Sequence, residues 1–251
     1  MKFTLKSDYA LNIIAIDKPP KYELKDTSCS TEKSSLLQVY CVRHQLFHGA
    51  AGITLLSETE RNPLYTTTYG VGEVIRDAIA RGCRHFIIGI GGSATNDGGI
   101  GMLQALGFDL LDQEGVPVRH GALGLRDLAV ISDSHVLPEL KECTFRIACD
   151  VTNPLCGPHG CSAVFGPQKG ADPAMIQQMD QWLSSYAALA RKSFPETNPA
   201  HAGAGAAGGL GFAFLTFSHA TLESGVNIIL EETHLSDYIK NADIVITGEG
   251  C

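Results

Sequence analysis

Residues 84–99, RHFIIGIGGSATNDGG, decide how this chain folds. The apolar run RHFIIGI has the composition of a strand that is buried on both faces of a parallel sheet. The run GGSATNDGG follows it as a turn, and Asn96 or Asp97 is placed to cap a helix over residues 102–106. Strand, glycine-rich turn and helix in this order are typical of an α/β unit.

The same alternation continues along the chain from about residue 50. Apolar spacing predicts a helix over 71–80, whose stop signal is Gly82, and Pro173 favours a long helix over 172–192. Further segments are a candidate strand at 10–16, a buried strand FRIACDV at 145–151, a short helix at 235–241 and a buried strand DIVIT at 243–247. We therefore predict an α/β fold with a mostly parallel sheet and flanking helices.

Polar loops follow the three predicted buried strands, at residues 91–99, at 150–160 and from Gly248 onward. In sheets of this kind, ligands bind beyond the carboxyl ends of the strands. The sequence therefore predicts that these loops, distant along the chain, meet in one binding site.

Composition limits the classes of function. The chain has 251 residues, of which 44% are hydrophobic and 18% charged, and its net charge is −8. These values favour a folded core and argue against nucleic-acid binding, which needs a basic surface. Residues 1–10 lack the apolar core of a signal peptide, and no apolar run reaches about 18 residues, so we expect neither secretion nor a membrane span.

The eight cysteines are expected to be reduced thiols rather than disulfides. Cys156 and Cys161 flank His159, but their spacing is not the Cys-x-x-Cys of a structural zinc site, and no second pair follows. Small buried or loop thiols are the favoured interpretation of this segment.

The glycine-rich loop is the strongest candidate for binding an anion. Glycines allow successive backbone N–H groups to face one concavity, and the start of a helix adds a partial positive charge. A tight turn that needs glycine for geometry alone is the alternative, at about even odds on physical grounds. The residues expected to contact phosphate are Gly91, Gly92, Ser93, Thr95 and Asn96.

Two acids follow the predicted strands. Asp97 is a candidate to hold a magnesium-bound water or to accept a substrate proton. Asp150 is a candidate to bind magnesium or orient a hydroxyl, with an Asx turn as the alternative. Asn153 and Thr67 are candidates to contact substrate, although a hydroxyl-rich segment before a helix also serves as a cap.

Two further segments have simpler interpretations. Lys169 stands on the turn GPQKG, where it suits a phosphate, but we predict a solvated surface charge. Residues 203–211, GAGAAGGLG, suit an anion-binding loop, but we favour a helix that packs closely through its glycines and alanines.

One alternative function comes from the pattern Gly89-x-Gly91-x-x-Ala94, which matches a loose dinucleotide fingerprint, with Asp109 or Asp112 near the distance of a ribose-binding acid. This pattern predicts an NAD(P)-binding oxidoreductase. The glycines continue through Gly98 and Gly99, however, so the helix begins later than the fingerprint requires. There is no Gly-x-x-x-x-Gly-Lys-Ser/Thr motif, so a P-loop kinase is not supported.

Together these segments resemble the class I glycerate kinases of bacteria. The stretches that carry the resemblance appear in the family's order: ERNPLYTTTYGVGEVIRDAIARGCRHFIIGIGGSATNDGG, GMLQALG, ACDVTNPLCGPHG, AVFGPQKGAD, GAGAAGGLGFA and ADIVITGEG. They cover about residues 49–250.

The resemblance implies a two-lobed α/β protein that transfers a phosphoryl group from magnesium-ATP to D-glycerate, with the 2-phosphate as the favoured product. It also implies a cytoplasmic role in sugar-acid catabolism. Residues 91–96 would form part of the phosphate-binding surface, Asp97 and Asp150 would be the acids near the transferring group, and Asp150 would be the magnesium ligand. The oligomeric state does not follow from the resemblance.

Both ends depart from the family. Residues 1–48 lack its Pro-Asp-Ser-Phe-Lys and Ala-Asp-Gly-Gly-Glu-Gly segments, so we divide the chain into an atypical segment, 1–48, and a glycerate-kinase-like region, 49–251. The family also continues beyond the position of Cys251. We therefore expect one lobe to be incomplete and kinase activity to be weak or absent, with a non-catalytic remnant as a further hypothesis.

Overall fold

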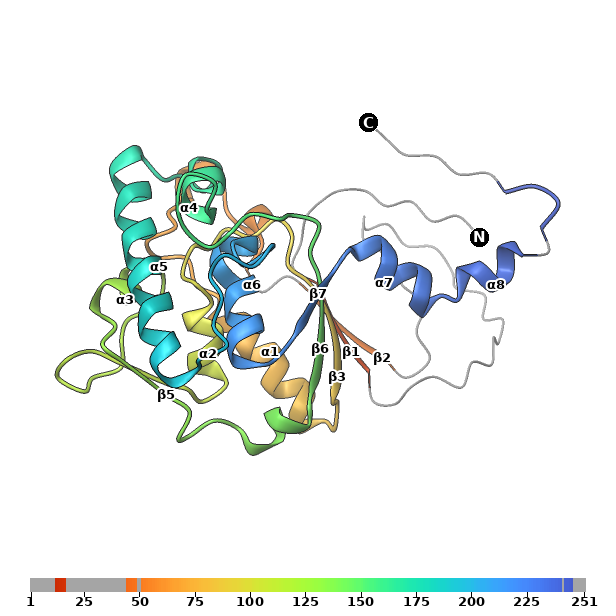
Figure 1. Cartoon of the computed structure of the whole chain (residues 1–251), viewed down its shortest axis with the longest axis horizontal. Helices are drawn as coiled ribbons and strands as arrows, with labels where there is room; N and C mark the ends of the chain where they lie inside the picture. The colour runs from red at the N-terminus through yellow and green to blue at the C-terminus, as the bar shows by residue number, and fades with distance from the viewer. Residues whose placement is uncertain (1–11, 17–43, 49–50, 241, 246–251) are drawn as a thin grey trace.

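The computed structural model describes residues 12–16, 44–48, 51–240 and 242–245. Its main sheet is seen nearly edge-on in Figure 1. Helices α1 to α6 lie on one side of this sheet, and α7 (Gly225–Glu232) and α8 (Leu235–Ile239) lie on the other. The arrangement is an α/β fold, as the alternation of segments predicts.

The main sheet has five strands in the order β2-β1-β3-β6-β7. The three strands β3, β6 and β7 are parallel to one another, as predicted, whereas β1 is antiparallel to both of its neighbours, so the sheet is mixed rather than mostly parallel. Strands β1 and β2 come from the segment predicted to be atypical. The bounds are β1 Asn12–Ile16, β2 His44–His48, β3 His85–Gly89, β6 Thr144–Ala148 and β7 Thr221–Glu223.

The third parallel strand is not where the sequence predicts it. Residues 243–245 of the predicted strand 243–247 are not in a strand, and Ile244 is 79% exposed. The rest of that segment and the loop from Gly248 onward lie outside the described residues. Strand β7, only three residues long, takes the third place, and three residues are too few for an alternating pattern to stand out.

Most predicted helices are confirmed. The helix predicted over 71–80 is α1, which buries the side chains of Val71, Ile75, Ala78 and Ile79. In α5, the Asp172 side chain caps the helix by accepting a hydrogen bond from the Met175 N–H at 2.8 Å. The helices are α1 Tyr69–Ala80, α2 Ile100–Ala105, α3 Ala122–Asp127, α4 Cys161–Phe165, α5 Pro173–Ser193 and α6 Ala206–Phe217.

The start of α2 differs from the prediction. Its N-cap is Gly99, in the left-handed conformation with a φ of 79°, rather than Asn96 or Asp97. The cap therefore lies two residues after Asp97 and three after Asn96, and the helix itself begins at Ile100. Within the described residues, no helix combines the length and apolar character needed to cross a bilayer.

Aromatic side chains join the sheet to the helical layer. Phe86 of β3 stacks on Phe145 of β6 with ring centroids 4.9 Å apart, and Phe145 contacts Phe214 of α6 at 5.8 Å. All three side chains are buried. The burial of these large rings fixes α6 against the face of β3 and β6.

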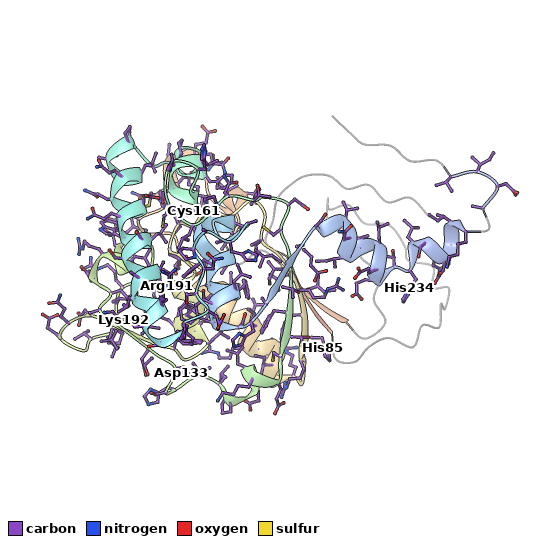
Figure 2. All side chains as sticks on the ribbon, viewed as in Figure 1. His85, Asp133, Cys161, Arg191, Lys192 and His234 are labelled. Carbon is purple, nitrogen blue, oxygen red and sulfur yellow. The ribbon has the colours of Figure 1, made fainter. Side chains whose placement is uncertain are left out.

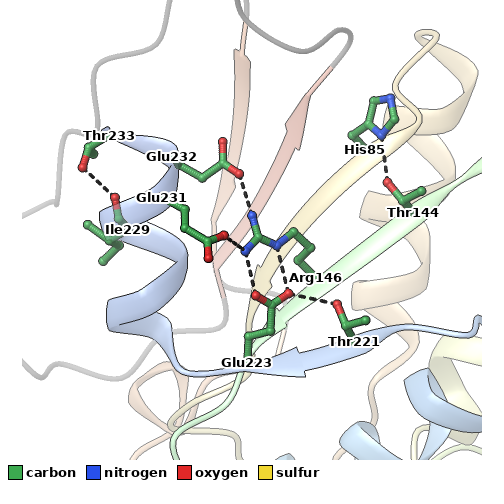
Figure 3. A network of polar contacts seen from close by, with 9 residues as sticks. All are labelled: His85, Thr144, Arg146, Thr221, Glu223, Ile229, Glu231, Glu232 and Thr233. Carbon is green, nitrogen blue, oxygen red and sulfur yellow. Dashed lines mark hydrogen bonds and ion pairs between the residues drawn. The ribbon is translucent and has the colours of Figure 1, made fainter. Parts of the chain in front are cut away.

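On the other face of the sheet, α7 is held mainly by charge (Figure 3). Arg146 of β6 donates hydrogen bonds to Glu223 of β7 and to Glu231 and Glu232 of α7, all at 2.6–2.9 Å. Arg146 therefore positions α7 so that its first residue, Gly225, lies at the carboxyl end of β7.

A second sheet lies away from the first. It pairs β4 (Asp109–Leu111) with β5 (Val130–Ser132) in antiparallel fashion. The turn that follows β4 contains Gly115, which has a φ of 78° and open space around the position of a Cβ atom.

The segment 203–211 is less regular than the helix that the sequence favours. Close packing is confirmed, but Ala207, Gly208 and Gly209 have left-handed backbone angles, so regular helix begins only after them. The Gly208 carbonyl accepts a hydrogen bond from the Gly98 N–H at 2.9 Å, and a Cβ atom on Gly208 would lie 2.1 Å from the Thr95 carbonyl oxygen. This turn therefore supports the glycine-rich loop directly.

Replacing Gly208 with Ala tests that contact. We expect G208A to lower the free energy of unfolding by about 3 kcal/mol or more, because it adds backbone strain and a clash with the loop. G115A is the matched control, because Gly115 has a similar φ but no atom close to the position of a Cβ. This variant should lower the free energy of unfolding by about 1 kcal/mol. Urea unfolding of both variants measures the difference, and equal losses would contradict the proposed contact.

Candidate functional site

The strand register brings the loops that follow β3, β6 and β7 to one edge of the sheet. Ala148, the last residue of β6, is opposite both Gly89 of β3 and Glu223 of β7. Just beyond, the Cys149 N–H donates to the Glu223 carbonyl at 2.8 Å. The loops 90–99 and 149–160 and the start of α7 therefore leave the sheet side by side. This confirms the predicted meeting of the first two loops.

The first half of the glycine-rich loop is held by residues 51–53. The Ala94 N–H donates to the Ala51 carbonyl and the Ile53 N–H donates to the Gly92 carbonyl, both at 2.8 Å. Gly92 has a φ of 62°, which glycine adopts without strain. Gly91 is exposed, and the hydrogen bonds found within the described residues leave the N–H groups of Gly91 and Gly92 unused. These amides are available to an anion.

Asp97 lies inside the protein, with no exposed surface. Its Oδ2 accepts hydrogen bonds from the Thr68 N–H at 2.8 Å and from the Thr68 hydroxyl at 2.9 Å, and its Oδ1 accepts from the Gly99 N–H at 3.1 Å. Burial raises the pKa of this carboxyl, while its donors lower it. The predicted role of proton acceptor for substrate does not fit this position. The carboxylate instead joins the end of the loop to the start of α1.

Thr67 belongs to the same network. Its hydroxyl donates to Asp97 Oδ2 at 3.3 Å and accepts from the Tyr69 N–H at 3.2 Å. A Cβ atom on Gly101 would lie 2.2 Å from the Thr67 hydroxyl oxygen, so α2 packs directly on it. This hydroxyl is engaged in the junction of α1 and α2 rather than free for substrate.

The prediction that Lys169 is a solvated surface charge is wrong. Lys169 is only 2% exposed, and its Nζ donates to the Ser93 hydroxyl at 3.0 Å and to the Thr95 carbonyl at 2.6 Å. The short 3-10 helix Pro167–Lys169 directs it inward. That helix fits tightly at Gly170, where a Cβ atom would lie 2.3 Å from the Arg61 carbonyl oxygen. Burial lowers the pKa of Lys169 to about 8.

The predicted phosphate-binding side chains lie deep in the loop. Ser93, Thr95 and Asn96 are 4%, 1% and 0% exposed. The Asn96 Nδ2 donates to the Ser162 hydroxyl at 2.8 Å, while the buried Asn96 Oδ1 and Thr95 hydroxyl have no hydrogen-bond partner in the part of the chain that the structure describes. Orphaned polar groups of this kind are uncommon in folded proteins and often mark functional sites.

Asp150 is the acid that faces solvent at this edge. Its Oδ1 accepts a hydrogen bond from the Gly225 N–H at 3.1 Å, at the first residue of α7. Asn153, three residues later, donates from Nδ2 to the His159 carbonyl at 2.9 Å, and its own carbonyl accepts from the Gly205 N–H. Asp150 thus lies where the loops leave the sheet, whereas the Asn153 side chain stabilises the conformation of its own loop.

The geometry does not support the dinucleotide alternative. Helix α2 begins at Ile100, well after Ala94. Asp109 lies in β4, where it pairs with His135 at 2.7 Å, and Asp112 accepts two backbone N–H groups within a turn. Both acids therefore form contacts within the second sheet and its turn.

Two residues that hold the loop were not predicted to do so from the sequence: Thr68 was not singled out, and Lys169 was predicted to be a surface charge. Lys169 lies 76 and 74 residues from its partners Ser93 and Thr95. A lysine on a turn has the same local pattern whether it points inward or outward. Thr68 gives a better signal, because a threonine shortly before a predicted helix is a natural partner for nearby backbone groups.

Comparison with known proteins gives a consistent result. The Glycerate kinase family profile matches residues 47–251. The chain is 49% identical over 201 residues to a glycerate kinase of Haemophilus influenzae, covering 80% of this chain and 53% of that protein. It is 48% identical to the glycerate 2-kinase of Escherichia coli K12, with the same coverage. The chain thus spans about half the length of the curated relatives it matches.

A solved structure agrees with this likeness. A crystal structure of a Salmonella typhimurium LT2 protein described as glycerate kinase 2 matches with a TM-score of 0.78 and 48% identity. The match covers 81% of this chain and 54% of that one. The fold described here therefore corresponds to about half of the solved structure.

Replacing Asp97 with Asn tests its place in the loop. We expect D97N to lower the free energy of unfolding by about 3 kcal/mol, because the amide nitrogen would face buried donors that now bind a carboxylate. The control is D150N, which changes an exposed side chain and should lower the free energy of unfolding by less than about 1 kcal/mol. Urea unfolding at pH 7 compares them, and a D97N protein as stable as D150N would show that the network is not needed.

Proposed function

This chain belongs to the glycerate kinase family, and from that premise we propose that it acts in ATP-dependent phosphoryl transfer to D-glycerate. The observation that carries the proposal is the single sheet edge at which the glycine-rich loop, Asp150 and the start of α7 meet. The name of the Escherichia coli relative, glycerate 2-kinase, supports 2-phosphoglycerate as the product. ATP is the phosphoryl donor in this proposal.

The glycine-rich loop is proposed to bind phosphate groups of ATP. The unused N–H groups of Gly91 and Gly92 and the hydroxyl of Ser93 are its donors for phosphate oxygens. A transfer of this kind requires little covalent chemistry from the protein, since alignment and charge stabilisation supply most of the rate. Thr95 and Asn96 lie beneath these donors and fix the shape of the loop.

Asp150 is proposed as the acid beside the transferring group, either as acceptor of the glycerate hydroxyl proton or as ligand of magnesium. Its exposure and its position at the loop ends support this role. Asp97, which is fully buried, is proposed to position the loop rather than to contact substrate. Thr67 supports Asp97 in this role, and Asn153 shapes the neighbouring loop.

Magnesium fits the donors that are present. Among the described residues there is no group of three His, Cys, Asp or Glu side chains that would hold a metal by themselves. Mg²⁺ at phosphate sites is usually held by one or two carboxylates together with substrate oxygens and water, which the single exposed carboxylate of Asp150 suits. When bound, the ion neutralises charge that develops on the phosphoryl oxygens.

The wider architecture is also a proposal. The curated relatives are about twice as long as the matched region, since 201 matched residues make up 53% of their length. This length supports a two-lobed protein in which the described α/β region supplies one side of the site. D-glycerate and ATP are the proposed partners, and a cytoplasmic location follows from where these metabolites are used.

A kinase assay tests the function. The chain is incubated with Mg-ATP and D-glycerate, ADP release is measured, and enolase added to the product distinguishes the 2-phosphate, its direct substrate, from the 3-phosphate. We expect glycerate-dependent ADP release to be weak, because the described region supplies only one side of the proposed site, and D150N should lower kcat a further 100-fold, roughly, or more if Asp150 is the base or the metal ligand. D133N, in an exposed loop (Figure 2), should leave kcat unchanged.

Two results would contradict the proposal. Equal turnover by D150N and the unmodified chain removes Asp150 from the chemistry. Binding of NADH, together with no detectable binding of ATP, would instead favour the oxidoreductase alternative.

A further inference from the structure

Lys169 has the features of a charged group placed to act on the glycine-rich loop. The Nζ atom donates to one side chain and one carbonyl of this loop, Ser93 at 3.0 Å and Thr95 at 2.6 Å. Because the Ser93 hydroxyl oxygen accepts from Lys169, its own hydrogen remains available to another acceptor. The lysine therefore fixes the loop and leaves the Ser93 O–H as a donor.

The charge on Lys169 is not neutralised by a direct partner. Both hydrogen-bond acceptors are uncharged, and within the described residues Nζ forms no ion pair. A buried charge without a counter-charge is costly. An anion that binds on the loop would lower this cost, because it brings negative charge close to the ammonium group.

The titratable groups around Lys169 are few. Its electrostatic neighbours are the Cys161 thiol of α4 and the Asp97 carboxylate of the loop. Burial raises the pKa of Cys161 to about 11, so this thiol is neutral up to pH 9. Asp97 already accepts hydrogen bonds from Thr68 and Gly99. Neither group accepts a hydrogen bond from Nζ, so the ammonium charge remains available to stabilise an anion that binds above it on the loop.

We propose that Lys169 is the positioning residue of the anion-binding loop, and that phosphate binding there is linked to protonation of its buried amino group. The lysine acts through Ser93 and Thr95 and does not contact the substrate itself. This inference rests on the proposed function, because it assigns the loop the phosphate groups of ATP. It adds that the unneutralised charge beneath the loop makes the site selective for anions.

A calorimetric titration tests the linkage. Mg-ATP is titrated into the chain at pH 8 in Tris and in EPPS, whose ionisation enthalpies differ, so that the difference in binding enthalpy gives the number of protons taken up. Burial lowers the pKa of Lys169 to about 8, so part of the free protein carries an unprotonated Lys169 at this pH. A bound anion raises this pKa, and binding should therefore take up a measurable fraction of a proton per site. ATP contributes little, because phosphate monoesters are ionised well below this pH.

Two variants test whether Lys169 is the group that takes up the proton on binding. K169M should take up none and should bind Mg-ATP about 10-fold more weakly at pH 7, with little further change up to pH 9.5. K192M is the matched control, because Lys192 is exposed near the C-terminal end of α5 (Figure 2). It lies about 30 Å along the helix from the first residue, Pro173. This variant should behave like the unmodified chain. If K169M does not fold, the proton uptake of the unmodified chain decides the question.

The outcomes separate this inference from the proposed function. Mg-ATP binding and phosphoryl transfer without proton uptake at pH 8 overturn only the role of Lys169. Inorganic phosphate titrated in the same way, binding with uptake while ATP is neither bound nor used, overturns only the kinase function. If neither ligand binds, both proposals fail.

Discussion

Two buried titratable residues determine the shape of the loop between β3 and α2. The Asp97 carboxylate accepts hydrogen bonds from Thr68 and Gly99, and the Lys169 ammonium donates to Ser93 and Thr95. Charged groups inside a protein are tolerated only when hydrogen bonds compensate for the lost water. The loop meets this requirement with its own backbone and side chains. Its conformation is therefore tied to satisfying both charges.

The glycines of the site satisfy a second, steric requirement. A Cβ atom on Gly208 would overlap the Thr95 carbonyl, and one on Gly101 would overlap the Thr67 hydroxyl. The turn before α6 therefore approaches the loop, and the first turn of α2 approaches the start of α1, more closely than any other residue type allows. In contrast to this close packing, Gly91 and Asp150 are exposed.

Local patterns predicted the fold well where they were long. The strand in the apolar run at 84–90 and the capped helix that starts at Pro173 can both be recognised from one sequence, by their apolar pattern and by the residues at their ends. Strand β7 was missed because three residues carry no period, and residues 243–245 were misjudged because an apolar composition does not guarantee burial. Within the site, the loop and Asp150 were recognisable from glycines and acids at strand ends. The burial of Lys169 was not, since it depends on residues more than 70 positions away.

Residues that contact one another in the site are far apart along the chain, and this affects how the site forms during folding. Thr68 and Asp97 are 29 residues apart, Lys169 and Thr95 are 74 apart, and Gly98 meets Gly208 from still further along the chain. Contacts between distant segments form only after much chain entropy has been lost, so they belong to the slow, late part of folding. A partly folded chain would contain β3 and α1 without an assembled loop. The nucleotide proposed to bind this loop would then have nothing to recognise until the final packing step, so its capture would report complete folding.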